Sequence, residues 1–290
     1  MSSQSSGPAA PQQQWDVDAV VIDLDGTLYR GTSAWFAAYV EATAVAADVD
    51  PATLRREVTG IIDGQRVLRI GDFYDPVPGV VVHASGWRPI SAWTWDGEPT
   101  DLPDGIRPDK PLPWDTPLVY VGDAFQAFTA ASAHLGVALQ ARREAFAGIR
   151  QRMINEEGTT EPTVSTTALE RTFSRARLRV LASNTAAELG QGLVARLESA
   201  KFFDEVRFGA RKPAGLVELL EEVCARAECP PERVLCVGDS YWNDVWPAVV
   251  AGCQAVWVDT HDTGAHDAPA RVRSLAELCP EPDPTTAQEE

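Results

Sequence analysis

Short, mainly apolar segments without polar alternation recur along the chain. They cover residues 19–22, 178–182, 206–208, 234–237 and 255–258. A strand with one exposed face alternates apolar and polar residues, whereas a strand buried on both faces has a continuous apolar run. The pattern therefore predicts the buried strands of a parallel sheet.

Segments with the apolar spacing of helices separate these strands. The first has Trp35, Phe36 and Tyr39 on its apolar face. Asp50 and Pro51 open the second, because Asp caps a helix and Pro is tolerated in its first turn. The predicted helices cover residues 32–47, 50–62, 125–155 with a break near Gly136, 167–176, 186–199, 213–226, 243–251 and 274–278. Strands that alternate with helices favour an α/β fold, here a Rossmann-like parallel sheet with helices on both faces.

This alternation is interrupted after the first strand. Residues 32–175 contain helical patterns and a segment rich in Trp and Pro, so we expect an inserted, mainly helical domain there. Residues 15–31 and 176–280 then form the α/β core. The ends of the chain, residues 1–14 and 281–290, lack core-forming residues and are expected to be disordered tails.

Residues 71–117 differ in composition from the rest of the predicted inserted domain. They hold nine of the 21 prolines and four of the 9 tryptophans, namely Trp87, Trp93, Trp95 and Trp114. We predict an ordered, loop-rich segment with a short hairpin at the valine run that begins at residue 80. Its indoles either pack the loops against a helix, which we favour, or contact a substrate.

Polar side chains follow the predicted strands at the points where the strands end. Asp23 and Asp25 follow the first strand, Ser183 the second, Lys212 the third and Asp239 the fourth. Because the carboxyl ends of parallel strands meet at one edge, where open α/β sheets bind ligands, we expect these side chains to converge.

Asp23 and Asp25 point the same way in an extended segment, since residues i and i+2 share a face. Two neighbouring carboxylates repel each other unless they share a cation, or unless one is a nucleophile and the other carries a proton. The alternative is that the Asp25-Gly26 pair is simply a turn.

Composition narrows the possible partners. The formal net charge of −17 argues against nucleic acid or an anionic membrane, because both require a basic surface. It does not exclude a small phosphorylated substrate, because the electric field at a small binding site depends on the charged groups close to it. The five cysteines show no metal-ligand spacing, and neither a signal peptide nor a membrane-spanning run is evident. We therefore expect a cytoplasmic monomer or homodimer with reduced thiols.

Four short motifs, each after a predicted strand, resemble the ordered motifs of the haloacid dehalogenase (HAD) superfamily. They are Asp23-Leu24-Asp25-Gly26-Thr27-Leu28, Ser183-Asn184-Thr185, Arg211-Lys212-Pro213, and Val237-Gly238-Asp239-Ser240 with Asn243-Asp244. The resemblance covers residues 18–28 and 178–258. The insertion between the first and second motifs is similar in position to the helical cap of the phosphoglycolate-phosphatase-like branch, although its Trp- and Pro-rich middle departs from that pattern.

The resemblance implies a role for each residue in phosphoryl transfer. Asp23 would be the nucleophile that forms an aspartyl phosphate, and Asp25 would be the acid and base for the leaving oxygen and the attacking water. The dehalogenases of the family lack an acid at the position of Asp25. Ser183 and Asn184 would bind the phosphoryl group, and Lys212 would neutralise charge. Ser183 can also act as a helix cap.

The resemblance also implies a Mg²⁺ site. Asp23, Asp239 and the backbone carbonyl of Asp25 would hold the ion, with Asp244 supporting it or holding Lys212. Carboxylates, a carbonyl and the substrate phosphate are the ligands that Mg²⁺ prefers. We therefore expect a Mg²⁺-dependent phosphatase acting on a small phosphorylated metabolite. The alternatives are a phosphomutase and a binding protein that has lost catalysis.

Three further residues have side chains suited to a functional site, but we predict no site for them. Val121-Gly122-Asp123-Ala124 echoes the fourth motif but lacks a second acid at the right spacing, so we interpret Asp123 as the N-cap of a helix. His83 and His134 have no metal-ligand partners nearby in the sequence.

Overall fold

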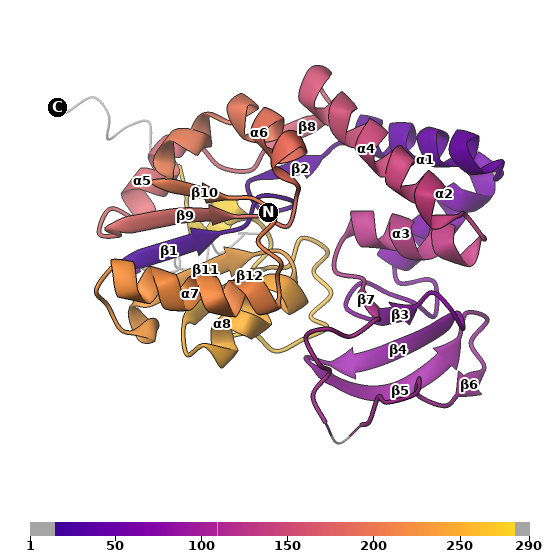
Figure 1. The fold of residues 1–290 in the computed structure, drawn as a ribbon. Helices are drawn as coiled ribbons and strands as arrows, with labels where there is room; N and C mark the ends of the chain where they lie inside the picture. Colours follow the sequence, from indigo (N-terminus) through magenta and orange to yellow (C-terminus); the bar gives the residue numbers. More distant parts are fainter. Residues whose placement is uncertain (1–14, 109, 282–290) are drawn as a thin grey trace, which may run out of the picture.

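The computed structural model describes residues 15–108 and 110–281. An α/β part and a second part made of helices and an antiparallel sheet lie side by side (Figure 1). The predicted disordered tails, 1–14 and 281–290, lie outside the described residues except for Glu281.

A parallel sheet with strand order β10-β9-β1-β11-β12-β13 forms the α/β part. Its strands are β1 (Ala19–Ile22), β9 (Leu178–Ala182), β10 (Glu205–Arg207), β11 (Val234–Gly238), β12 (Gln254–Val258) and β13 (Ala270–Val272). β1 lies between β9 and β11, with Ile22 paired to Leu181 and Val237. The predicted fold class is confirmed, and its first strand ends in the middle of the sheet. β13 was not predicted, because its short Ala-Arg-Val run has no apolar signature.

Helices cover both faces of this sheet. They are α5 (Thr166–Thr172), α6 (Ala187–Arg196), η1 (Glu198–Phe202), α7 (Ala214–Arg226), η2 (Pro231–Arg233), η3 (Tyr241–Val245, a π-helix), α8 (Trp246–Val250) and α9 (Leu275–Leu278). α5 and α6 lie on one side, and α7 and α8 on the other (Figure 1). Alternate residues of β1 point to the two layers: Val20 joins the core cluster of α5 and α6, and Val21 that of α7. This explains why the strand is apolar throughout.

The chain leaves and re-enters the α/β part through two paired strands, β2 (Tyr29–Gly31) and β8 (Thr160–Pro162). The part of the chain between them, residues 32–159, is called the insertion below. α5, which follows β8, packs against η1 beside the parallel sheet. The predicted domain limits, 15–31 with 176–280 and 32–175, stay predictions.

The insertion combines a helical layer with an antiparallel sheet. Its helices are α1 (Ser33–Ala47), α2 (Pro51–Ile62), α3 (Ala124–His134) and α4 (Leu139–Asn155). The sheet, in the order β6-β5-β4-β3-β7, contains β3 (Phe73–Asp75), β4 (Val80–Ser85), β5 (Arg88–Thr94), β6 (Pro99–Thr100) and β7 (Val119–Tyr120). The helices were expected, whereas the sheet replaces most of the predicted loop-rich segment.

Proline positions explain why this sheet was taken for loops. Pro76 and Pro78 lie in the turn between β3 and β4, and Pro99 lies in the edge strand β6. Pro89 pairs with Ala84 next to a shift in register between β4 and β5. Turns, edges and irregular pairs are the places where a sheet tolerates a residue without an N–H. A high proline content is therefore compatible with five strands.

Two tryptophans of the insertion pack against the α/β part. The Trp87 ring lies 5.1 Å from that of Trp246, and the Trp114 ring 5.4 Å from that of Trp242. Trp242 and Trp246 belong to η3 and the start of α8, directly after β11. These indoles support the packing interpretation over the substrate interpretation. They also fix the antiparallel sheet to the segment that follows Asp239.

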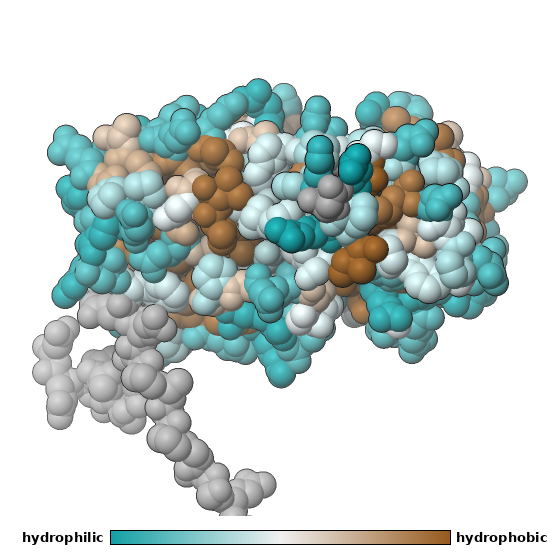
Figure 2. Space-filling model, turned by 90° about the horizontal axis from the view of Figure 1, so that it is seen from below, coloured by the Kyte–Doolittle hydropathy of each residue, from teal (hydrophilic) through white to brown (hydrophobic). Residues whose placement is uncertain are grey.

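The surface of both parts is mainly hydrophilic with dispersed hydrophobic patches on the face shown in Figure 2. None of the helices in the described part of the chain has the length and apolar character required to cross a membrane.

Candidate active site

Asp23 stands at the end of the central strand. Its N–H donates to the carbonyl of Val237 at 2.9 Å, which continues the pairing of β1 with β11 by one residue. The loop then turns at Gly26, where φ is +76°. A Cβ on Gly26 would lie 1.8 Å from Oδ2 of Asp239. Glycine is therefore required both by the backbone conformation and by the close approach of Asp239.

Lys212 joins the third motif to the first. Its Nζ donates to Oδ1 of Asp23 at 2.5 Å, to Oδ1 of Asp244 at 2.6 Å and to the carbonyl of Ala182 at 3.0 Å. The side chain is only 3% exposed. Burial alone would lower the pKa of Lys212, but the two carboxylates raise it above its usual value. The ammonium is therefore charged, and its three protons are all donated.

Three buried carboxylates from separate motifs meet beside Lys212. Oxygen atoms of Asp23, Asp239 and Asp244 lie within 4.8 Å of one another. Burial raises the pKa of the Asp23 carboxyl to about 7, although the Lys212 ammonium opposes the rise. Burial likewise raises the pKa values of Asp239 and Asp244. One ammonium cannot balance three carboxylates, so the cluster fits a divalent cation and can hold a metal ion such as Mg²⁺.

Hydrogen bonds in the segment after β11 and a glycine at the end of that strand position the Asp244 side chain. Ser240 accepts a hydrogen bond from the N–H of Asn243 at 3.3 Å and so caps η3, while its own N–H donates to Oδ2 of Asp244 at 3.1 Å. A Cβ on Gly238 would lie 2.3 Å from Cγ of Asp244. The absence of a side chain at residue 238 therefore allows Asp244 to fold back towards Lys212.

Asp25 has surroundings unlike those of the three clustered carboxylates. Its carboxylate accepts hydrogen bonds from the Tyr29 hydroxyl, from Nη1 of Arg150, from Ser183 at 3.0 Å and from Thr185 at 2.8 Å. Burial alone would raise the pKa of Asp25, but the charge of Arg150 and the hydrogen bonds lower it to about 2. Asp25 is ionised here, and its side chain is not one of the clustered metal-binding groups.

The second motif contacts the first and the third. Ser183 is fully buried and uses its hydroxyl to donate to Asp25 and to accept from the N–H of Thr185. The Asn184 amide accepts from the N–H of Lys212 at 2.7 Å and donates to the Lys212 carbonyl at 3.0 Å. Both side chains thus hold their neighbours in place. The phosphate-binding roles of Ser183 and Asn184 stay predictions.

Sequence reasoning missed Arg150, which reaches the site from α4 of the insertion. The residue is 3% exposed, and its guanidinium lies 4.7 Å from the Phe125 ring centre and 5.1 Å from that of Phe146. Nη2 donates to Thr185 at 3.0 Å. Arg150 lies next to Ile149 and three residues before Met153, both buried. An arginine on the buried side of a helix was the available signal.

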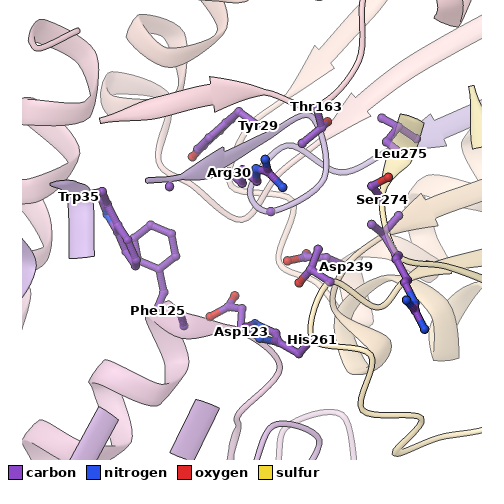
Figure 3. A pocket seen from close by; sticks show the side chains of 16 residues that line it. Tyr29, Arg30, Trp35, Asp123, Phe125, Thr163, Asp239, His261, Ser274 and Leu275 are labelled. Carbon is purple, nitrogen blue, oxygen red and sulfur yellow. The ribbon is translucent and has the colours of Figure 1, made fainter. Parts of the chain in front are cut away.

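Asp123 is a helix cap, as predicted, but it also belongs to the site. Its carboxylate accepts from the N–H of Gln126 at 2.7 Å at the N-terminus of α3. Burial, opposed by that hydrogen bond and reinforced by the charge of Asp25, raises the pKa of Asp123 to about 6. Figure 3 shows the Asp123 carboxylate facing Asp239 across a cavity. The similarity of residues 121–124 to the fourth motif therefore falls on a residue close to the acidic cluster.

Two adjoining cavities of about 250 Å³ each open at the acidic cluster. The Lys212 cavity includes Asp23, Asn184, Arg150 and Lys212 in its lining. The Trp35 cavity has the rings of Trp35 and Phe125 at the end away from Asp239, with Arg30 and His261 along its sides (Figure 3). Asp123 and Asp239 line both, so a bound molecule can extend from one cavity into the other. His83 and His134 line neither.

Comparison with known proteins agrees with this arrangement. A family model described as haloacid dehalogenase-like hydrolase matches residues 17–252, which is most of the chain. The chain therefore belongs to the haloacid dehalogenase-like hydrolases. No curated protein matches the sequence.

Solved structures show the same fold at low identity. The HAD-hydrolase YfnB from Bacillus subtilis is 13% identical with a TM-score of 0.51, over 91% of this chain and 97% of that one. A protein from Thermotoga maritima described as a beta-phosphoglucomutase is 17% identical with a TM-score of 0.51, over 90% and 96%. A haloacid dehalogenase-like hydrolase from Bacteroides fragilis is 14% identical with a TM-score of 0.50, over 90% and 99%. The crystal structure of YfnB bound to magnesium reveals interdomain movement in that protein.

Proposed function

We propose that this hydrolase is a Mg²⁺-dependent phosphatase of the phosphoglycolate-phosphatase-like branch, acting on a small phosphorylated metabolite through an aspartyl phosphate. The observation that carries the proposal is the buried Asp23 carboxylate, held by Lys212 at 2.5 Å with a second carboxylate, Asp25, two residues further on. The net charge of −17 supports a small substrate over nucleic acid or a membrane surface.

In the first step, Asp23 attacks phosphorus. Its Oδ1 accepts from Lys212, whereas among the described residues Oδ2 accepts only a 3.3 Å hydrogen bond from Thr27, so Oδ2 is the oxygen available for attack. A bond forms between Oδ2 and phosphorus, and the bond from phosphorus to the ester oxygen breaks. Lys212 limits the negative charge that builds up between the carboxylate and the phosphoryl group.

Asp25 transfers the protons in both steps of the proposed reaction. Asp25 is ionised in the described state, so it first takes up a proton, which a phosphate monoester that enters as its monoanion can supply. It gives this proton to the departing oxygen, which leaves as an alcohol. The ionised Asp25 then takes a proton from the water that attacks the aspartyl phosphate, and inorganic phosphate and free Asp23 result. Tyr29 and Thr185 orient the Asp25 carboxylate through their hydroxyl groups.

The acidic cluster supplies the metal site. Asp23, Asp239 and Asp244 would hold Mg²⁺, together with the backbone carbonyl of Asp25. When bound, the ion offsets the charge of the phosphoryl oxygens, which otherwise meet buried carboxylates.

A screen of phosphorylated metabolites for phosphate release tests this function. We expect release with Mg²⁺, none after exhaustive chelation, and recovery when Mg²⁺ is added back. Asp239→Asn should require more Mg²⁺ or be inactive, whereas Asp101→Asn, at an exposed position in the insertion, should match the wild type. Full activity after chelation contradicts the metal assignment. Phosphate transfer that needs a bisphosphate primer identifies a phosphomutase instead.

A further inference from the structure

The Lys212 cavity is short of cations for a phosphorylated ligand. Its lining contains the carboxylates of Asp23, Asp25, Asp123, Asp239 and Asp244, but only Lys212 and Arg150 as cations. A phosphate monoester brings up to two further negative charges. Lys212 has no proton left to donate, because its three acceptors are Asp23, Asp244 and the Ala182 carbonyl. The Mg²⁺ ion of the proposed function would offset part of this charge but donates no hydrogen bond, so a second positively charged donor would favour the binding of a phosphoryl group.

The position of Arg150 and the geometry of its side chain both fit this second donor. Its guanidinium lines the same cavity, and its Nε has no hydrogen-bond partner although the side chain is buried. A guanidinium presents its N–H groups in a planar fork that matches two phosphate oxygens. The rings of Phe125 and Phe146 lie against it and restrict its motion.

Asp25 does not depend on Arg150 for its hydrogen bonds. Without the guanidinium, its carboxylate still accepts from Tyr29, Ser183 and Thr185. A contact of Nη1 with a phosphoryl oxygen would replace one anionic acceptor of Arg150 by another, and Asp25 would keep its three hydroxyl donors. In the described state, the Asp25 carboxylate is the anion that Arg150 binds.

We propose that Arg150 is a phosphoryl-binding residue supplied by the insertion, and that its guanidinium passes from Asp25 to the phosphoryl group when a substrate enters. This inference rests on the proposed function and deepens it. Because Arg150 belongs to α4 while Lys212 and the acidic cluster belong to the α/β part, one bond to the phosphoryl group joins both parts around the substrate. The insertion would thus detect the phosphoryl group itself, whatever the rest of the substrate is.

Binding of inorganic phosphate, measured by calorimetry with saturating Mg²⁺, tests the inference without turnover. Loss of a charge-assisted hydrogen bond predicts that Arg150→Met weakens phosphate binding about 10- to 100-fold. Arg150→Lys should lose less, since it keeps the charge but not the fork. Arg152→Met is the matched control, because Arg152 lies on the same helix but pairs with Glu156 at the surface. Thermal unfolding of each variant establishes that it is folded.

A double-mutant cycle separates phosphate binding from a merely structural role. If Asp25 and phosphate compete for Arg150, then Asp25→Asn should strengthen phosphate binding, and this gain should shrink in the Arg150→Met background. Wild-type phosphate affinity in folded Arg150→Met, or an additive cycle, overturns the role of Arg150 and leaves the proposed function intact. A wild type that neither binds phosphate nor hydrolyses any monoester overturns both.

Discussion

At the residue scale, the two aspartates of the first motif have opposite electrostatic surroundings although one residue separates them. Burial raises the pKa of Asp23 to about 7, whereas Arg150 and three hydroxyl groups outweigh burial and lower that of Asp25 to about 2. Both residues follow the end of β1 at Ile22, and the chain there turns so that Asp23 faces Lys212 while Asp25 faces the second motif and α4. The two chemically identical groups therefore titrate differently, and the Lys212 ammonium together with a bound cation would favour the ionised form that Asp23 needs as a nucleophile.

The two aspartates should fail in different ways when mutated. Asp23→Asn should show no acyl phosphate and essentially no turnover, because an amide is a poor nucleophile. Asp25→Asn should react once with p-nitrophenyl phosphate, whose leaving group needs no acid, and then turn over about 10²- to 10⁴-fold more slowly. We expect a burst of one p-nitrophenolate per site in stopped flow.

Acid quenching and mass spectrometry locate the phosphoryl group in that experiment. It should be on the peptide that carries Asp23. Label on Ser183, or wild-type turnover by Asp23→Asn, would show that the nucleophile has been misassigned.

At the scale of elements, the insertion is anchored to the α/β part through its antiparallel sheet. Trp87 lies in the turn between β4 and β5 and packs against Trp246, which begins α8. Phe73 of β3 lies 5.2 Å from Trp242 in the same region. The helices α1 to α4 have no such aromatic anchor to α8. The sheet therefore fixes one side of the insertion to the segment that follows Asp239.

Removing the Trp87 ring should weaken this anchor. We expect Trp87→Ala to lower the free energy of unfolding by roughly 1–3 kcal/mol, the usual cost of losing a partly buried aromatic pair. Limited proteolysis should cut the insertion faster than in the wild type. Val77→Ala is the control, since Val77 is 92% exposed in the turn between β3 and β4 of the same sheet. Equal urea midpoints for Trp87→Ala and the wild type would mean that the aromatic contact contributes nothing.

The elements that sequence predicted well are those with a local signal. β1, β9, β11 and β12 are mainly apolar runs, and the break between α3 and α4 falls at Gly136, whose φ is +79°. Of the antiparallel sheet, the hairpin of β4 and β5 at the valine run was predicted. The other strands were missed because the prolines of the sheet occupy turns and edges, a placement that depends on pairing between distant strands. The spacing of apolar residues in the sequence indicates the periodicity within one strand. It does not indicate which other strand that strand pairs with.

The same distinction applies to the candidate site. Asp23, Ser183, Lys212 and Asp239 were expected together, because parallel strands that end at one edge bring them together regardless of the intervening length. Asp244 was assigned through the resemblance to the family. Arg150 was missed because its position depends on how α4 packs over the α/β part. Nothing local to the helix fixes that orientation.

At the scale of the whole molecule, a histidine joins the far end of the chain to the insertion. Nδ1 of His266 accepts a hydrogen bond from the N–H of Gly86 at 2.9 Å, and the ring lies 4.4 Å from that of Tyr241. Burial lowers the pKa of His266 from 6.5 to about 4. The folded protein thus requires the neutral imidazole, both as an acceptor and as a buried ring.

Mild acid should therefore destabilise the protein through His266. The unfolded chain takes up a proton as the pH falls below about 6.5, while the folded chain resists until about pH 4. The contribution of this group is complete above pH 6.5 and is lost as the pH falls towards 4. By pH 5 the loss should be about 2 kcal/mol.

Urea unfolding at pH 7.5, 6 and 5 measures this effect. His266→Gln keeps a hydrogen-bond acceptor but cannot titrate, so it should lose less stability between pH 7.5 and pH 5 than the wild type. Parallel losses in the two proteins would assign the acid sensitivity to other groups.

The pairing of β2 with β8 has a consequence for protein engineering. Gly31 pairs with Thr160 in an antiparallel ladder, and the N–H of Thr32 donates to the carbonyl of Thr159 at 3.1 Å. Neighbouring ends of antiparallel strands can be joined by a two-residue turn such as Asn-Gly. The chain thus passes between the two parts at one pair of neighbouring strands, so replacing residues 32–159 by a short turn would not reroute the remaining chain. Such a variant would lose the contacts of Trp87, Trp114 and Arg150 with the α/β part.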